Sequence, residues 1–171
     1  MFGRKTSLLI AFAAGALLVV GVSVLYLNRD QKPPASPTAL DARSFPIYVP
    51  RQASDISYIA SDSTFDTEST VLTTTLSLQD GTKIILTQQP TPEVFGDVPQ
   101  QYSKMLALLN QYKEVKSEFG TIALTRPKEL NGGQSAVVNR PGTLIFAKPS
   151  RDLTEEEWQT FFAALQEYNS T

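Results

Sequence analysis

The chain has 171 residues, with 15 basic and 17 acidic side chains, and it contains neither histidine nor cysteine. Their absence excludes a Ser-His-Asp triad, a thiol nucleophile and ordinary structural zinc sites. From Ser44 onward, ten basic side chains stand against fifteen acidic ones. That balance disfavours nucleic acid as a partner, because such binding depends on neutralising phosphates.

The first element is the apolar run LLIAFAAGALLVVGVSVLYL, Leu8 to Leu27, which has no charge, proline or amide. About 20 apolar residues in a helix cross a hydrocarbon layer of roughly 30 Å. A core helix of so small a protein would show a polar face, and this run shows none. The sequence therefore predicts a transmembrane helix over residues 7–27 and a lipid bilayer as its partner.

The same run could be a cleaved signal peptide or a retained anchor. Signal peptides usually have an apolar region of roughly 7 to 15 residues followed by a small-x-small cleavage site. Here the run is longer and is followed by Asn-Arg-Asp, which is a poor peptidase site, while Tyr26 suits a membrane interface. We expect a retained anchor, with residues 1–6 and their charges Arg4 and Lys5 as a cytoplasmic tail and the rest extracytoplasmic.

Residues 28–43 contain QKPPASPTALDA, whose prolines and small residues favour an extended spacer. The alternative is a loop packed on the domain that follows. Residues 44–171 are numerous enough for one domain with a sizeable core.

Two β-hairpins are predicted within that domain. Leu72, Thr74, Leu76 and Leu78 alternate with polar residues, and Asp80-Gly81 then supports a tight turn into a strand over Lys83–Gln88. The stretch QSAVVNRPGTLIFAKP predicts a second hairpin, with short apolar strands on either side of a turn at its Pro-Gly pair. Further strands are expected at Phe45–Val49, Ile56–Ala60 and Thr121–Thr125.

Two helices are predicted. A middle helix over Pro99–Tyr112 has an apolar stripe, and a final helix begins with Thr154 and Glu157 as a capping box. The stripe of the middle helix is Tyr102, Met105, Leu106 and Leu109, and that of the final helix is Trp158, Phe161, Phe162 and Leu165.

The order of elements predicts an α+β fold, an antiparallel sheet with the two helices packed on one face. The chain also shows a possible duplication into two hairpin-helix repeats. Gly81–Pro90 roughly matches Gly142–Pro149, and Met105–Tyr112 matches Phe161–Tyr168. The alternative is that two such units converge on similar core residues.

The acidic segment DSTFDTES places Asp62, Asp66 and Glu68 within seven residues. These carboxylates could bind calcium or serve a hydrolase. An EF-hand loop, however, needs Gly at its sixth position and Glu at its twelfth, where this chain has Thr67 and Thr73. The segment is therefore interpreted as a solvated acidic loop, and no catalytic, cofactor-binding or metal-binding residue is predicted.

FPIYVPR, IILTQQ and GTLIFAKPSRDLTEEEWQTFFAALQ occur in that order. In this arrangement the chain resembles uncharacterised bacterial single-pass membrane-anchored domains, related to extracytoplasmic domains of some anti-sigma factors. The resemblance implies a bacterial envelope protein of no known activity, without family catalytic residues to carry over. The chain departs from anti-sigma factors because six residues before the predicted span leave no room for a sigma-binding domain.

We therefore expect a non-enzymatic, single-pass membrane protein whose extracytoplasmic domain, residues 44–171, binds an envelope protein and needs no cofactor. One alternative is a carrier of lipid or another apolar ligand. A second is a carboxylate-dependent hydrolase using Asp62, Asp66 or Glu68.

Overall fold

The computed structural model describes residues 45–51, 56–98, 100–128 and 132–168, apart from the side chains of residues 58–62. All of them belong to one compact unit, Pro33–Thr171. The predicted tail, transmembrane helix and linker, residues 1–43, lie outside this described part. Within it, no helix has the length and apolar character needed to cross a bilayer.

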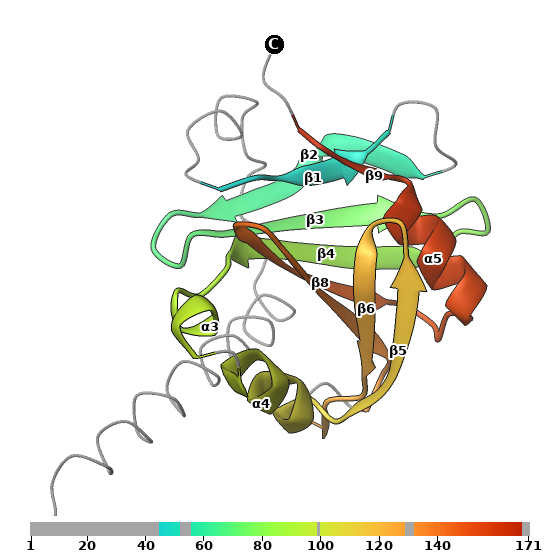
Figure 1. The fold of residues 1–171 in the computed structure, drawn as a ribbon. Coiled ribbons are helices and arrows are strands. Elements are labelled where there is room, and N and C mark those ends of the chain that lie inside the picture. Colours follow the sequence, from blue (N-terminus) through green and yellow to red (C-terminus); the bar gives the residue numbers. More distant parts are fainter. Residues whose placement is uncertain (1–44, 52–55, 99, 129–131, 169–171) are drawn as a thin grey trace, which may run out of the picture. The chain divides into compact units, whose positions relative to one another are not determined.

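The described chain forms a mainly antiparallel β fold with few short helices (Figure 1). Seven strands make one sheet in the order β2-β3-β4-β8-β7-β6-β5, and β1 pairs with β9 in a small second sheet. The strands are β1 (Tyr48–Pro50), β2 (Ser57–Asp66), β3 (Val71–Ser77), β4 (Lys83–Pro90), β5 (Gln111–Ser117), β6 (Gly120–Thr125), β7 (Ser135–Arg140), β8 (Thr143–Pro149) and β9 (Leu165–Glu167). The helices are α3 (Val94–Asp97), α4 (Gln100–Leu108) and α5 (Glu155–Ala163).

Both predicted hairpins are confirmed. Strands β3 and β4 are joined through Asp80 and Gly81, and Gly81 has a φ of 83°. Strands β7 and β8 are joined through Pro141 and Gly142, which has a φ of 79°. A Cβ on Gly142 would also lie 3.0 Å from Cδ of Pro46. Glycine is therefore required here by both backbone conformation and space.

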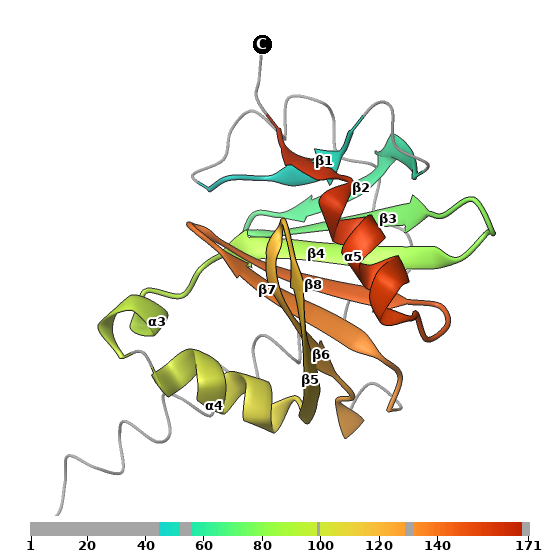
Figure 2. The same cartoon turned by 45° about the vertical axis from the view of Figure 1, so that its right-hand side comes forward.

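The two hairpins meet at the centre of the large sheet, where β4 pairs antiparallel with β8. Leu86 lies directly opposite Ala147 in this pairing. Strands β5 and β6 run across the direction of β3 and β4, which shows how strongly the sheet twists (Figures 1 and 2).

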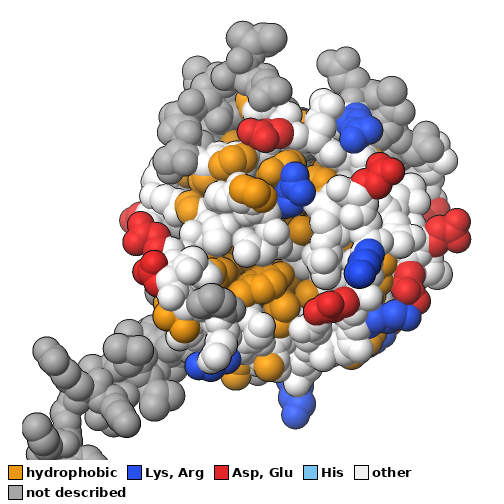
Figure 3. Space-filling view, in the orientation of Figure 1, with side chains coloured by type: hydrophobic (Ala, Val, Ile, Leu, Met, Phe, Trp, Pro, Cys, Tyr) orange, Lys and Arg blue, Asp and Glu red, His pale blue; other side chains and the backbone are white. Residues whose placement is uncertain are grey.

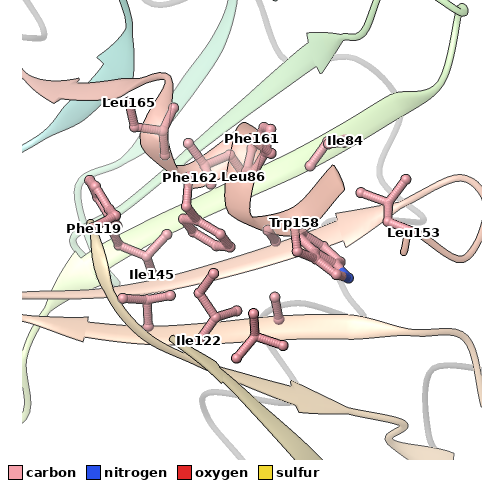
Figure 4. Close-up of a cluster of buried hydrophobic side chains, with 14 of the residues drawn as sticks. Ile84, Leu86, Phe119, Ile122, Ile145, Leu153, Trp158, Phe161, Phe162 and Leu165 are labelled. Atoms are coloured by element: carbon pink, nitrogen blue, oxygen red, sulfur yellow. The ribbon is translucent and has the colours of Figure 1, made fainter. Parts of the chain in front are cut away.

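The main core lies between α5 and one face of this sheet. Figure 4 shows Trp158, Phe161 and Phe162 of α5 among apolar side chains of the strands. The capping box predicted at Thr154 and Glu157 is confirmed, with hydrogen bonds in both directions. The residues that the seven-stranded sheet contributes to this core are Leu76, Ile84, Leu86, Val115, Ile122, Leu124, Ala136, Val138, Ile145 and Ala147.

The other face of the sheet is also covered near its centre. Side chains alternate between the faces of a strand, so Val137 and Leu144 point away from α5, and both have no exposed surface. The buried apolar residues of α4, Met105 and Leu106, and the buried Leu109 that follows the helix are not members of the cluster that α5 joins.

Two helix ends differ from the prediction. The final helix stops at Ala163, and Leu165, predicted to continue its apolar stripe, belongs to β9. Pairing of β9 with β1 ends the helix, because the backbone groups of the segment bond across to residues such as Ile47 and Arg51 instead. The middle helix stops at Leu108, and Asn110 adopts a φ of 52° before β5 begins.

Strand β2 is longer than predicted and extends to Asp66. The acidic segment interpreted as a loop is therefore a strand as far as Asp66, followed by a turn over residues 67–70. Pairing with β3 accounts for this, since Asp66 lies opposite Val71 and the buried hydroxyls of Ser63 and Thr74 are 3.0 Å apart.

Buried glutamine Gln88 of β4 joins the two sheets. The backbone amide of Tyr48 in β1 donates to Oε1 of Gln88 at 2.7 Å, and Nε2 of Gln88 donates to the carbonyl oxygen of Tyr48 at 2.9 Å. The side chain thus replaces the hydrogen bonds that a neighbouring strand would supply.

Helix α5 also protects the edge of the large sheet. Nε2 of Gln159 donates to the carbonyl oxygen of Lys116 in edge strand β5 at 2.8 Å, and Lys113 forms an ion pair with Glu155. These contacts, with the exposed lysines of β5, disfavour pairing of this edge with another chain.

Candidate interaction surface

Of the acidic residues considered from the sequence, Asp66 has a local structural role. Oδ1 of Asp66 accepts a hydrogen bond of 3.0 Å from the backbone amide of Glu68, which closes the turn after β2. Glu68 is exposed, and the side chain of Asp62 is outside the described part. No three acidic residues of that part form a group that could hold a metal ion.

A second charged cluster joins the β3–β4 turn to the start of α5. Nη2 of Arg151 lies 2.6 Å from a carboxylate oxygen of Asp80 and 2.7 Å from one of Glu157. Hydrogen bonding to Arg151 is the main cause that lowers the pKa of each carboxyl to about 2. Both acids stay ionised at neutral pH and are occupied by the same guanidinium, so neither is poised to exchange protons with a substrate.

The most distinctive surface feature is apolar. Among the side chains that the structure describes, the exposed large hydrophobic ones are Val94 (36%), Val98 (38%), Leu108 (60%) and Tyr112 (48%). All four come from one stretch of chain that includes α3, α4 and the start of β5. We call these four residues the α3–α4 surface.

The two helices are held together by aromatic contact. The rings of Phe95 in α3 and Tyr102 in α4 meet edge to face, with centroids 5.5 Å apart. Burial is the first cause that raises the pKa of Tyr102 to about 12, followed by the charge of Glu114, so this phenol stays neutral. Because Met105 of α4 and Leu109 directly after it are buried, Leu108 is left facing solvent.

Tyr112 is fixed from two sides. The Arg126 guanidinium carbon lies 5.5 Å from its ring centroid, and Nε2 of the buried Gln134 donates to its hydroxyl at 2.8 Å. An aromatic side chain held in this way is presented with little conformational entropy left to lose on binding.

Charges border the apolar residues. Glu93 and Asp97 lie next to Val94 and Val98, are exposed, and have no ion-pair partner in the described part. On the face shown in Figure 3, hydrophobic side chains gather in the middle, and acidic and basic side chains lie around and between them. An apolar centre with a polar border is typical of protein-binding surfaces.

Sequence reasoning did not find this surface. Leu108 was available as a signal, because it falls outside the stripe of Tyr102, Met105, Leu106 and Leu109. Gln88 could also have been identified as buried, because it is in phase with Ile84 and Leu86 along the strand. Gln134 lies directly before β7 and belongs to no periodic pattern, so the neighbouring sequence did not indicate that it is buried.

No protein-family model, curated protein or solved structure matches this chain.

Proposed function

We propose that the chain is a non-enzymatic, single-pass membrane protein whose domain, residues 44–171, binds another envelope protein through the α3–α4 surface. The observation that carries this proposal is the confinement of exposed large apolar side chains, within the described part, to Val94–Tyr112. Scattered single apolar residues need no explanation, whereas a contiguous exposed apolar patch marks a binding site, and in this proposal the four residues form one such patch.

The chemistry of this surface favours a protein partner. Tyrosine is enriched among residues that dominate binding energy, and Tyr112 is already held in place. The exposed carboxylates of Glu93 and Asp97, which have no ion-pair partner among the described residues, suit a partner that combines apolar and basic groups. The same carboxylates disfavour direct docking onto anionic lipid headgroups.

The location of the protein rests on the sequence. In this proposal residues 7–27 span the membrane, residues 1–6 are cytoplasmic, and residues 28–43 connect the anchor to an extracytoplasmic domain. The resemblance to bacterial membrane-anchored domains agrees with this arrangement.

The carrier alternative needs an open apolar cavity. In that alternative the groove lies on the face of the sheet opposite the helices, and on the face that points away from α5 the side chains of Val137 and Leu144 have no exposed surface. This packing makes protein binding the better supported of the two functions.

We also propose that the domain contains an internal duplication. The matched segments Gly81–Pro90 and Gly142–Pro149 contain β4 and β8, which are neighbours in the sheet. Leu86 and Ala147 are equivalent in the matched segments and also lie opposite each other, as a two-fold relation between the hairpins requires. We confine the proposed repeat to the hairpins, because α4 does not join the cluster of α5.

The binding function is tested by capture from the native envelope. Full-length protein is purified in detergent from its own cells, and copurifying molecules are identified by mass spectrometry. We expect one stoichiometric protein, retained by the control Thr160→Ser on the exposed side of α5 and lost with Leu108→Ser or Val98→Ser. Equal capture by all three variants would contradict the assigned surface, and stoichiometric lipid in place of protein would favour the carrier.

A further inference from the structure

Asp80 and Gly81, in the turn between β3 and β4, form a pair whose main chain is open to chemical rearrangement. In an Asp-Gly pair the glycine nitrogen lies within reach of the aspartate carboxyl group, and no Cβ obstructs its approach. A Cβ on Gly81 would meet no atom within 4 Å, and 47% of the Asp80 side chain is exposed, so water has access. The pair therefore meets the steric requirements for isoaspartate formation.

Isoaspartate formation at this pair takes two steps. In the first, the nitrogen of Gly81 attacks Cγ of a neutral Asp80 carboxyl group, an N–Cγ bond forms, and the carboxyl hydroxyl leaves with the amide proton as water. In the second, water adds to the backbone carbonyl carbon of the cyclic imide and breaks the bond of that carbon to nitrogen. The chain then runs through Cγ, with an additional main-chain carbon and a free carboxylate on Cα.

Both oxygens of the Asp80 carboxylate already accept hydrogen bonds. Oδ1 accepts from the backbone amide of Thr82 at 2.9 Å, and Oδ2 accepts from the Thr82 hydroxyl at 2.9 Å and from Nη2 of Arg151 at 2.6 Å. The bond to Arg151 is the main cause that lowers the pKa of Asp80 to about 2. The carboxylate is therefore held ionised, and in that form it is a poor electrophile because it has no hydroxyl to lose.

The attacking nitrogen and the guanidinium are held as well. The amide of Gly81 donates to the carbonyl oxygen of Leu78 at 3.0 Å, so its proton is engaged within the turn. Nε of Arg151 donates to the Thr82 hydroxyl at 2.9 Å, and Nη2 donates to Oε1 of Glu157 at 2.7 Å. These two contacts fix the cation beside the turn.

We propose that Asp80 is a latent site of isoaspartate formation, which Arg151 and Thr82 keep unreactive in the folded domain. Loss of this protection would change the turn permanently. The amide of Leu78 donates to the carbonyl oxygen of Thr82 at 2.8 Å, and an additional main-chain carbon between them would disrupt this closure and move the carboxylate away from Arg151. The site includes no residue of the α3–α4 surface and does not depend on the function proposed for it.

The test measures isoaspartate at residue 80 after incubation of the full-length protein in detergent at neutral pH. Proteolytic peptides are separated by chromatography and identified by electron-transfer fragmentation, which distinguishes isoaspartate from aspartate at equal mass. A synthetic peptide of residues 76–86 gives the rate without tertiary contacts. Arg151→Gln removes the guanidinium, and Glu157→Gln is the matched control, because it removes the other ion pair of Arg151 and leaves the contact with Asp80.

We expect slower formation in the wild type than in the peptide. Arg151→Gln should react about tenfold faster than the wild type, which is the increase in neutral carboxyl group when the pKa rises by one. Glu157→Gln should stay near the wild-type rate.

Equal rates in the wild type and the peptide would overturn the proposal, and this comparison requires no variant to fold. Equal rates in the wild type and Arg151→Gln would also overturn it. A rise of the same size in Arg151→Gln and Glu157→Gln would do so too, because general loosening of the domain would then account for the reaction.

Discussion

The indole nitrogen of Trp158 donates a hydrogen bond of 2.9 Å to Oε1 of Gln134 inside the core. The same oxygen accepts from the amide of Leu153 at 2.7 Å, while Nε2 donates to the Leu153 carbonyl at 3.2 Å and to the Tyr112 hydroxyl at 2.8 Å. One buried amide is thus fully satisfied. It fastens the start of α5 to the chain before β7 and to the α3–α4 surface.

Replacement of Gln134 by leucine should therefore destabilise the domain strongly. The change leaves the Trp158 indole and the Leu153 amide buried without acceptors, at about 1–3 kcal/mol for each unsatisfied group. We expect a loss of about 3 kcal/mol in the free energy of unfolding, measured by urea denaturation. The exposed Gln79→Leu serves as control, and a loss no larger than in that control would show that the amide is dispensable.

Gln88 should hold β1 against the main sheet. Gln88→Ala removes both hydrogen bonds to Tyr48. We therefore expect the free energy of unfolding to fall by about 2 kcal/mol and hydrogen exchange at the Tyr48 amide to become faster. The neighbouring Gln89→Ala, on the half-buried opposite side of the strand, should change neither quantity appreciably. Unchanged exchange at Tyr48 in the Gln88 variant would mean that pairing with β9 alone secures β1.

The aromatic residues of α5 should dominate core stability. Phe162 contacts both Trp158 and Phe119 through its ring, and Phe162→Ala should cost about 3–5 kcal/mol by thermal or urea unfolding. Leu108→Ala removes an exposed apolar side chain and should change stability by less than about 0.5 kcal/mol. Similar losses in the two variants would be incompatible with the packing in Figure 4.

Acid should weaken the link between the β3–β4 turn and α5. The pKa values of Asp80 and Glu157 are lowered to about 2, below the ordinary values of 3.8 and 4.5 expected in the unfolded chain. The two ionised carboxylates therefore contribute to the stability of the folded domain above pH values of 3.8 and 4.5, and this stability is lost as the pH falls toward 2.

We expect the Tm of the wild type to fall more steeply between pH 5 and pH 2 than that of Arg151→Gln, with the difference reduced by salt. Lys148→Gln, outside the cluster, should follow the wild type. Parallel profiles for the wild type and Arg151→Gln would show that the ion pairs contribute nothing measurable.

Local features of the sequence were sufficient to predict several elements. The Asp80-Gly81 and Pro141-Gly142 turns, the alternation at Leu72 and Leu76, and the Thr154–Glu157 capping box all depend on residues within one turn or hairpin. Such signals act over short distances, because turn conformations and caps involve neighbours in the chain. They predicted an antiparallel sheet followed by a final helix without any knowledge of the tertiary structure.

The candidate surface and the edges of the sheet depended on contacts between distant segments. Leu165 continued a helical pattern, but pairing of β9 with β1 made it part of a strand. Tyr112 was expected at the end of a helix. It lies instead near the start of β5, where Gln134 donates a hydrogen bond to its hydroxyl.

By itself, the sequence determined local conformation, the absence of histidine and cysteine chemistry, and the apolar run from which a membrane anchor is predicted. Only the tertiary structure decided which strands are neighbours, which glutamines join the sheets and the helix, and which apolar side chains remain in solvent. The physical reason is that burial and hydrogen-bond partners belong to pairs of distant residues, and a pattern along the chain does not specify such pairs.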